Sequence, residues 1–191
     1  ALLKKAHQND ILILNSQTVT SFQELNDAVE VVTNGITFKT NKLLFTTNGF
    51  ASQLTNNQVQ PARAQVLITK PIPNLDIRGT FHLDKGYFYF RNINDRILFG
   101  GGRNLDFAGE TTTSHDTTEL IQNRLEELLK TVILPHQEFE IEHRWSGTMG
   151  VGTHKKPIVE QLSNNVYCGV RMGGMGVAIG SLVGQELADL L

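Results

Sequence analysis

The chain has 191 residues, of which 40% are hydrophobic and 19% are charged, and its formal net charge is −2. This length accommodates one large domain or two small ones, and so weak a charge gives no electrostatic case for binding nucleic acid or an anionic membrane. No apolar run approaches the ~18 residues of a membrane-spanning helix. The single cysteine, Cys168, excludes an internal disulfide and is expected to be a small buried side chain in a cytoplasmic protein.

The first half of the chain is predicted to consist mainly of short strands. Residues 1–10 resemble the last turns of a helix and lack an initiator methionine, which suggests a fragment of a longer protein. Residues 11–14, "ILIL", are expected to form a buried strand. Alternation of apolar and polar residues on both sides of Asn34 and Gly35 predicts a β-hairpin. Further strands are expected over 18–22, 42–45, 62–69, 79–83, 87–91 and 96–102, the last three forming an antiparallel meander.

The second half is predicted to contain one clear helix and three more strands. Residues 116–119 resemble a capping box that begins the helix, and Pro135 ends it. The apolar stripe of this helix consists of Ile121, Leu125, Leu128 and Val132. Strands are expected over 138–145, 156–162 and 165–170. The fold class that follows is α+β, a mostly antiparallel sheet with a few helices.

The C-terminal stretch 169–180, "GVRMGGMGVAIG", joins the last strand to a terminal helix through a glycine-rich loop. A Rossmann fingerprint is excluded, because its third glycine would fall on Ile179 and only 11 residues follow Gly180. Two interpretations stay open. Unpaired N–H groups at a helix N-terminus suit an anion or an electron-rich ring. Alternatively, small residues spaced four apart let the helix lie close to a sheet, namely Gly176, Gly180, Gly184 and Ala188.

Histidines and acidic residues near the third quarter of the chain do not predict a metal site. His136, Glu138, Glu140 and Glu142 fall on one face of an alternating strand, where a solvated surface explains them and no zinc-type spacing appears. Residues 154–156, "HKK", are expected in a surface loop rather than in an anion site.

Arginines and tyrosines, in contrast, favour a ligand pocket. Tyr87, Tyr89 and Arg91 share one strand face, and Arg103 follows a second glycine cluster at 100–102. Arginine forks bind carboxylates bidentately, and tyrosines orient small polar ligands.

Six segments of the chain occur in an order typical of one protein family. They read "TNGF", "PARAQVLIT", "GYFYFRNINDRILFGGGRN", "RWSGTMG", "KPIV" and "GVRMGGMGVAIGSLVGQELADLL". These segments resemble the C-terminal half of the FAD-dependent amine and amino-acid oxidoreductases of the D-amino-acid oxidase, glycine oxidase and sarcosine oxidase superfamily. The branch that contains γ-glutamylputrescine oxidoreductase looks nearest. The resemblance spans nearly the whole chain.

The resemblance implies that the C-terminal loop closes over the flavin of FAD. The implied cofactor-binding residues are Val19, Thr47, Asn48, Gly49, Trp145, Gly147, Arg171, Met172, Gly173, Gly174, Met175, Gly176 and Val177. The implied substrate-binding residues are Tyr89, Arg91 and Arg103. A helix N-terminus beside the flavin would stabilise negative charge on the reduced ring.

The resemblance also divides the chain into three parts. Residues 1–60 would belong partly to the FAD lobe, 61–144 to the substrate-binding lobe, and 145–191 would form a C-terminal FAD-contacting segment. The family's N-terminal GxGxxG unit, which grips the ADP moiety, does not occur in this sequence. The chain alone is therefore expected to be inactive, to lack FAD, and to pair with the missing lobe or with a second copy of itself.

Two functions are consistent with the sequence. The resemblance implies a parent protein that oxidises a C–N bond of an amine or amino acid by hydride transfer to FAD. Some members place a carboxylate-binding arginine where this chain has Gly174. Either Arg91, Arg103 or Arg171 then replaces it, or the substrate is an amine without that carboxylate. The alternative function is a substrate-lobe or interaction domain without a cofactor.

Overall fold

The computed structural model describes residues 1–53 and 59–191. The α-helices are α1 (Leu2–Gln8), α2 (Glu119–Leu128) and α3 (Gly176–Ala188). The strands are β1 (Val19–Glu24), β2 (Val29–Thr33), β3 (Thr37–Thr40), β4 (Leu43–Phe45), β5 (Gln60–Thr69), β6 (Thr80–Leu83), β7 (Phe88–Ile93), β8 (Arg96–Gly101), β9 (Ile141–Val151), β10 (Ile158–Ser163) and β11 (Val166–Val170). Short helical turns are η1 (Asn48–Gln53), η2 (Asp84–Gly86), η3 (Arg103–Leu105) and η4 (Leu129–Ile133).

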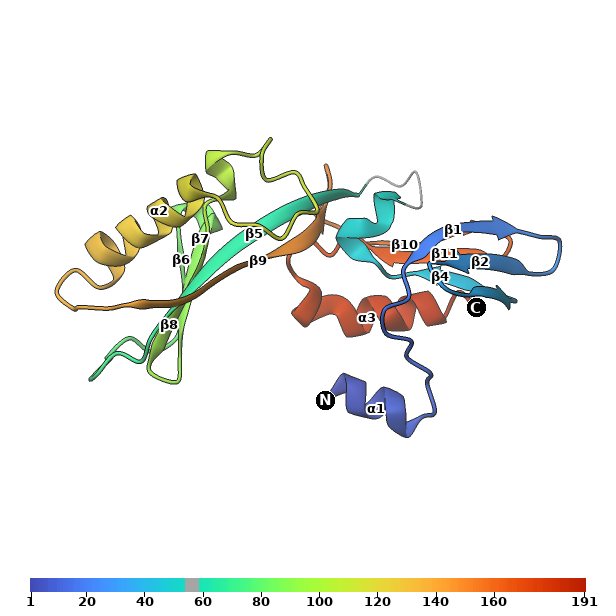
Figure 1. The fold of residues 1–191 in the computed structure, drawn as a ribbon, viewed down its shortest axis with the longest axis horizontal. Helices are drawn as coiled ribbons and strands as arrows, with labels where there is room; N and C mark the ends of the chain where they lie inside the picture. The colour runs from blue at the N-terminus through green and yellow to red at the C-terminus, as the bar shows by residue number, and fades with distance from the viewer. Residues whose placement is uncertain (54–58) are drawn as a thin grey trace.

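The strands form three sheets, and the only parallel pair among the described residues is β11 with β4. Their orders are β1-β2-β3, β10-β11-β4 and β6-β7-β8-β5-β9. Figure 1 shows an elongated molecule in which the long strands β5 and β9 run side by side from the five-stranded sheet toward the two smaller sheets. The predicted α+β class with mostly antiparallel sheets is confirmed.

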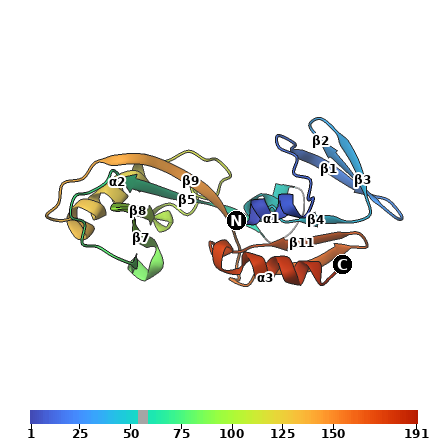
Figure 2. The same ribbon diagram turned by 90° about the horizontal axis from the view of Figure 1, so that it is seen from below.

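The two smaller sheets and α3 form a three-layered body. In Figure 2 the β10-β11-β4 sheet lies between the β1-β2-β3 sheet and α3. All of β11 is buried, because alternate residues of the strand face opposite layers. Val166, Cys168 and Val170 belong to one hydrophobic cluster with residues of β2 and β4. The expectation that Cys168 is a buried side chain is confirmed, and this burial raises the pKa of its thiol.

The five-stranded sheet has a core of its own. Helix α2 covers one face of the sheet (Figure 1), and Ile121, Leu125 and Leu129 pack there against Leu67 and Phe99. The predicted hairpin at Asn34 and Gly35 is also present, as the antiparallel pair β2 and β3.

The prediction of a buried strand at residues 11–14 is wrong. These residues belong to no strand and their four apolar side chains are exposed. Asp10 and Ser16, which flank them, have positive φ angles of 54° and 60°. An apolar run needs a neighbouring strand to supply hydrogen-bond partners, and among the described residues none pairs with this one.

The start and the apolar stripe of the predicted helix also differ from expectation. Helix α2 begins after Thr118, not after Asp116, and no side chain caps it. The reason is tertiary: Gln65 of β5 hydrogen-bonds both the backbone N–H and the hydroxyl of Thr118. After Leu128 the helix widens into a π-turn, which rotates the following residues. Val132 is therefore 52% exposed, while Leu129 is buried.

The small residues spaced four apart in α3 do not make the contact with the sheet. Gly184 has open space where a side chain would stand, whereas Val183 and Leu187 are buried. A Cβ on Gly169 of β11 would lie 3.1 Å from Leu187 Cδ2 and 3.2 Å from Val183 Cγ1. The glycine that lets helix α3 approach the sheet closely is therefore Gly169 in strand β11.

Candidate functional site

The two faces of the five-stranded sheet differ in character. Along β5, residues alternate between buried side chains that face α2 and half-buried ones on the opposite face. Across the sheet the register places Arg91 opposite Thr80 and Leu98, and Tyr89 opposite His82 and Gly100. The face away from α2 therefore carries a band of polar and glycine residues.

Gly100 makes room for the Tyr89 ring on this face. A Cβ at Gly100 would lie 2.9 Å from Tyr89 Cε2 and 2.4 Å from Val66 Cγ1. Tyr89 keeps 37% of its surface exposed, and partial burial of its hydroxyl raises its pKa, because the phenolate is harder to bury than the neutral phenol. Tyr89 is thus a neutral hydroxyl donor and acceptor at ordinary pH.

The glycine-rich loop after β11 is held against the end of β9. The Met172 N–H donates to Asn48 Oδ1 at 3.1 Å, and the Gly173 N–H donates to the Gly150 carbonyl at 2.9 Å. Arg171, Gly173 and Gly174 all have positive φ angles, a conformation that glycine adopts without strain. The loop therefore turns sharply, and it is exposed at Gly173, Gly174 and Met175.

A cavity of about 850 Å³ lies between this loop and the sheet. It brings together the three predicted substrate-binding residues, Tyr89, Arg91 and Arg103, with three of the predicted flavin contacts, Gly173, Gly174 and Met175. These residues come from β7, η3 and the segment before α3, so only the folded chain places them around one space.

The other predicted cofactor-binding residues do not line this cavity. Trp145 and Gly147 share the cavity face of the sheet, since they pair with Val66 and Ala64. Arg171 donates from Nε to the Lys156 carbonyl. Thr47, Asn48 and Gly49 lie where η1 meets the end of β9, Met172 is bonded to Asn48, and Gly176 and Val177 begin α3. Val19 packs against the hydrophobic cluster that contains Val166, Cys168 and Val170, together with residues of β2 and β4.

Sequence reasoning missed several residues that line the cavity. They are Ala64, Thr80, His82, Lys85, Gly86, Phe90, Leu98, Phe107, Met149, Val151 and Lys155. Tyr87 and Gly101, which the sequence had marked beside Tyr89 and in the second glycine cluster, line the cavity as well. Lys155 lies in the segment expected to be only a surface loop. Strand register would have found Thr80 and His82 as neighbours of Arg91 and Tyr89, but the turn residue Lys85 and the loop residue Lys155 left no signal.

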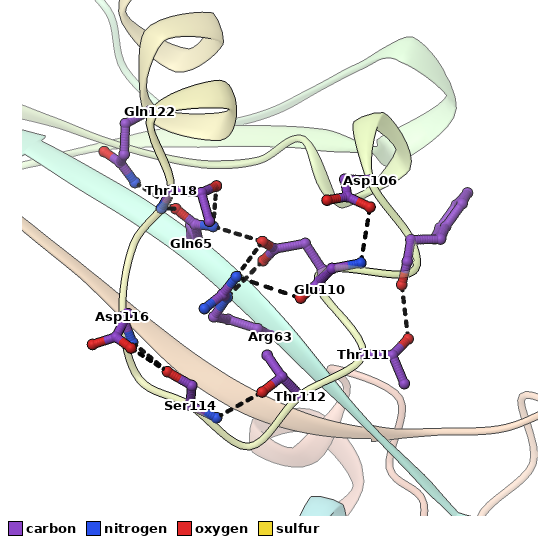
Figure 3. Close-up of polar contacts among 12 residues, drawn as sticks. Arg63, Gln65, Asp106, Glu110, Thr111, Thr112, Ser114, Asp116, Thr118 and Gln122 are labelled. Carbon is purple, nitrogen blue, oxygen red and sulfur yellow. Dashed lines mark hydrogen bonds and ion pairs between the residues drawn. The ribbon is translucent and has the colours of Figure 1, made fainter.

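A buried polar network anchors the segment that carries Arg103 and Phe107 (Figure 3). Arg63 of β5 donates to Glu110 from Nη2 at 2.7 Å and from Nε at 3.0 Å, and Gln65 Nε2 donates to the same carboxylate at 2.9 Å. Glu110 is 1% exposed, and its hydrogen bond raises the pKa of Arg63. The network holds Glu110 and Thr118 to strand β5 on the α2 side of the sheet. Phe107 lines the cavity instead, and Arg103 stacks over its ring at 5.0 Å.

Two further features of the described residues bear on the class of site. Within residues 1–53 and 59–191, no three metal-ligating side chains are grouped so as to hold an ion. No helix in the same ranges is long and apolar enough to cross a membrane.

Solved structures share this fold. An L-proline dehydrogenase from P. horikoshii superposes with a TM-score of 0.80 at 20% identity, covering 98% of this chain and 52% of that chain. A glycine oxidase from Bacillus cereus gives 0.80 at 17% identity, covering 97% and 53%. An iminodiacetate oxidase from Chelativorans sp. gives 0.75 at 16% identity, covering 97% and 51%. The chain thus spans about half the length of these structures.

The chain therefore shares the fold of about half of each of these oxidoreductases. The family model described as "FAD dependent oxidoreductase" matches residues 1–190, and the chain belongs to that family. Among curated proteins, none matches the sequence. The family membership confirms the expected superfamily; the γ-glutamylputrescine branch stays a prediction.

The residues at the loop fit the flavin that the family implies. The N–H groups of Gly174, Gly176 and Val177 have no acceptor among the described residues, and they precede or begin the 13-residue helix α3. Gly173 has open space where a Cβ would stand, and Val177 is fully exposed. Free donors at the positive end of a helix suit an electron-rich ring.

Proposed function

We propose that this chain forms the substrate-binding lobe and the C-terminal flavin-contacting segment of an oxidoreductase that oxidises the C–N bond of an amine or amino acid with FAD. The observation that carries the proposal is the cavity that joins Arg91, Arg103 and Tyr89 to the Gly173–Met175 loop. The substrates named in the three similar structures support it, since proline, glycine and iminodiacetate all contain a C–N bond next to a carboxylate.

FAD, when bound, supplies the hydride acceptor, and the chain's own residues supply binding and orientation. The free N–H groups at Gly174, Gly176 and Val177 hold the electron-rich side of the cofactor. The Tyr89 hydroxyl and the Arg91 and Arg103 guanidiniums hold the polar groups of the substrate. The apolar side chains of Leu98, Phe107 and Met149 exclude water around it.

The division into lobes at residues 1–60, 61–144 and 145–191 is part of the proposal, as is a cytoplasmic location. We place the pyrophosphate grip in a lobe outside this chain, because the glycine-rich loop offers free donors to the ring and the family's GxGxxG unit for the pyrophosphate does not occur in this sequence. The 191-residue chain alone is then expected to be inactive, to lose FAD, and to pair through exposed apolar side chains such as those of residues 11–14 or of Val177.

The test uses the protein expressed from its complete gene. It is expected to be yellow and to lose its flavin colour under anaerobic conditions when a secondary amine or amino acid is added. Gly173→Ala is expected to slow this bleaching at least tenfold, because its Cβ enters the space beside the loop. Gly79→Ala is the matched control, since Gly79 also has a positive φ but lies outside the cavity. A colourless complete protein that takes up no FAD would contradict the proposal.

The isolated chain gives a second measurement. Titration with FAD, followed by flavin fluorescence, is expected to show no saturation in the sub-micromolar range. Tight binding there would mean that the cofactor grip lies within these residues.

A further inference from the structure

The cavity lining carries positive charge without any balancing carboxylate. Lys85, Arg91, Arg103 and Lys155 line it together with His82, and no Asp or Glu does. The other described cavities each include two acidic side chains: Glu138 with Glu140, Glu160 with Glu186, and Glu24 with Asp27. A positive cavity in a chain whose net charge is −2 attracts anions.

The pairing of the arginines supports this conclusion. Within residues 1–53 and 59–191, five of the eight arginines form salt bridges, namely Arg63, Arg78, Arg96, Arg124 and Arg144. Arg171 donates to a backbone carbonyl. Arg91 and Arg103 remain. Their guanidinium groups have no oxygen partner in those ranges, and both residues line the cavity. The Nε atom of Arg103 is buried without an acceptor, which is costly unless a ligand supplies one.

The two free arginines lie at different positions along the sheet. Arg91 of β7 pairs with Leu98 of β8, whereas Phe88, three residues before it, pairs with Gly101. Three strand residues span roughly 10 Å. The Gly102 N–H donates to the Tyr87 carbonyl at 3.0 Å, so the turn η3, which begins at Arg103, starts beside the Tyr87 end of β7. Stacking on Phe107 orients the Arg103 guanidinium. Because each fork binds one carboxylate, the cavity offers two separated anion sites with the Tyr89 hydroxyl on the strand between them.

We propose that the cavity binds a substrate with two acidic groups, one held by Arg91 and the other by Arg103, with Lys85 and Lys155 adding attraction. That this dianion is also the amine being oxidised rests on the proposed function; the anion selectivity does not. The cavity then discriminates against monocarboxylates, which leave one arginine unpaired, and against diamines, which four cations repel.

The test is a titration of the 191-residue chain with glutarate, a simple dicarboxylate, followed through the Nε–H signals of its arginines by NMR. Pentanoate and 1,5-diaminopentane are the matched monoanionic and dicationic probes. Glutarate is expected to saturate and to shift the Arg91 and Arg103 signals. Arg91→Gln and Arg103→Gln are each expected to weaken binding about tenfold or more, the value of one charge-assisted hydrogen bond. Arg78→Gln, the same change at an arginine outside the cavity, is expected to leave binding within about twofold.

Equal binding of pentanoate and glutarate, saturable binding of the diamine, or equal loss in Arg78→Gln would overturn the inference. A variant that fails to fold is recognised from its NMR spectrum, and the wild-type comparison of the three probes then decides alone. The complete flavoprotein separates the two proposals. If it oxidises a diamine but no dicarboxylic amino acid, the inference fails while the function stands. If glutarate binds but no amine bleaches the flavin, the function fails while the anion site stands.

Discussion

The two faces of the five-stranded sheet are made by alternate residues of the same strands, yet they treat charge in opposite ways. On the face under α2, the Arg63 guanidinium meets the Glu110 carboxylate at 2.7 Å and both are almost fully buried. On the opposite face, Arg91 and Arg103 line a cavity and meet no protein oxygen among the described residues. A buried charge with a partner serves structure, whereas an unpaired charge in a cavity is free for a ligand.

The largest effect is expected from breaking the paired face. Glu110→Gln keeps the shape of the side chain but removes the carboxylate that is paired with the buried Arg63 guanidinium, which is expected to lower the free energy of unfolding by about 3–5 kcal/mol. Urea denaturation measures this difference. Glu127→Gln, which breaks the exposed pair with Arg124, is the control and is expected to cost less than about 1 kcal/mol. A loss as small for Glu110→Gln would remove the contrast between the faces.

The next effect concerns the space that Gly100 leaves on the cavity face. Gly100→Ala places a methyl group 2.4 Å from Val66 Cγ1 and 2.9 Å from Tyr89 Cε2, so it is expected to destabilise the chain by about 1–3 kcal/mol and to displace the Tyr89 ring. Unfolding curves and the NMR signals of the ring report the two consequences.

Two further variants sharpen this result. Adding Val66→Ala to Gly100→Ala removes the shorter contact and is expected to recover part of the stability. Gly147→Ala, on β9 of the same sheet, meets nothing within 4 Å and is expected to leave stability unchanged or slightly higher. If Gly100→Ala and Gly147→Ala change the stability equally, overpacking does not cause the loss of stability in Gly100→Ala.

The sequence predicted much of the strand content because alternation and turn residues are local. The hairpin at Asn34 and Gly35 and the shared face of Tyr89 and Arg91 followed from spacing alone. Helix α2 began later than expected because Gln65, 53 residues away from Thr118, takes its hydrogen bonds. No local pattern contains such a contact.

The site was predicted only in part, because local patterns reveal its residues but not how distant segments meet. The glycine loop and the arginines stood out by composition, but their meeting around one cavity depends on sheet register and on the hydrogen bond that the Met172 N–H donates to Asn48 Oδ1. Lys155 was assigned to a surface loop because a lysine in a polar loop is ordinary until the fold places it beside other cations.

A smaller, pH-dependent effect is expected at Tyr89. Burial raises the pKa of Tyr89 in the folded chain. A tyrosine in the unfolded chain has a pKa near ~10. As the pH rises, the unfolded state therefore loses this proton before the folded state does. The stabilisation from this difference is fully present below about pH 10 and is lost as pH rises through the folded pKa. The difference in unfolding free energy between wild type and Tyr89→Phe is therefore expected to be constant below that pH and to move against the wild type above it. Parallel curves throughout would show that Tyr89 is not buried as described.

The smallest expected effect concerns the cavity face, and the informative quantity is the sign of the change in unfolding free energy. Arg91 has no oxygen partner among the described residues and shares its cavity with other cations. Arg91→Gln is therefore expected to change the unfolding free energy by less than about 0.5 kcal/mol and to be slightly stabilising at low salt. Arg78→Gln removes the same charge but breaks the exposed pair with Asp95, so it is expected to be slightly destabilising.

Both differences are expected to shrink at high salt, because exposed charges are screened over about 8 Å at physiological ionic strength. Urea denaturation of Arg91→Gln and Arg78→Gln, each at low and at high salt, measures these differences in unfolding free energy. A loss above about 1 kcal/mol for Arg91→Gln would mean that Arg91 has a structural partner, and the cavity face would then resemble the face under α2. Opposite signs for two identical substitutions would instead show that the fold leaves the charge of Arg91 unbalanced and free to bind an anion.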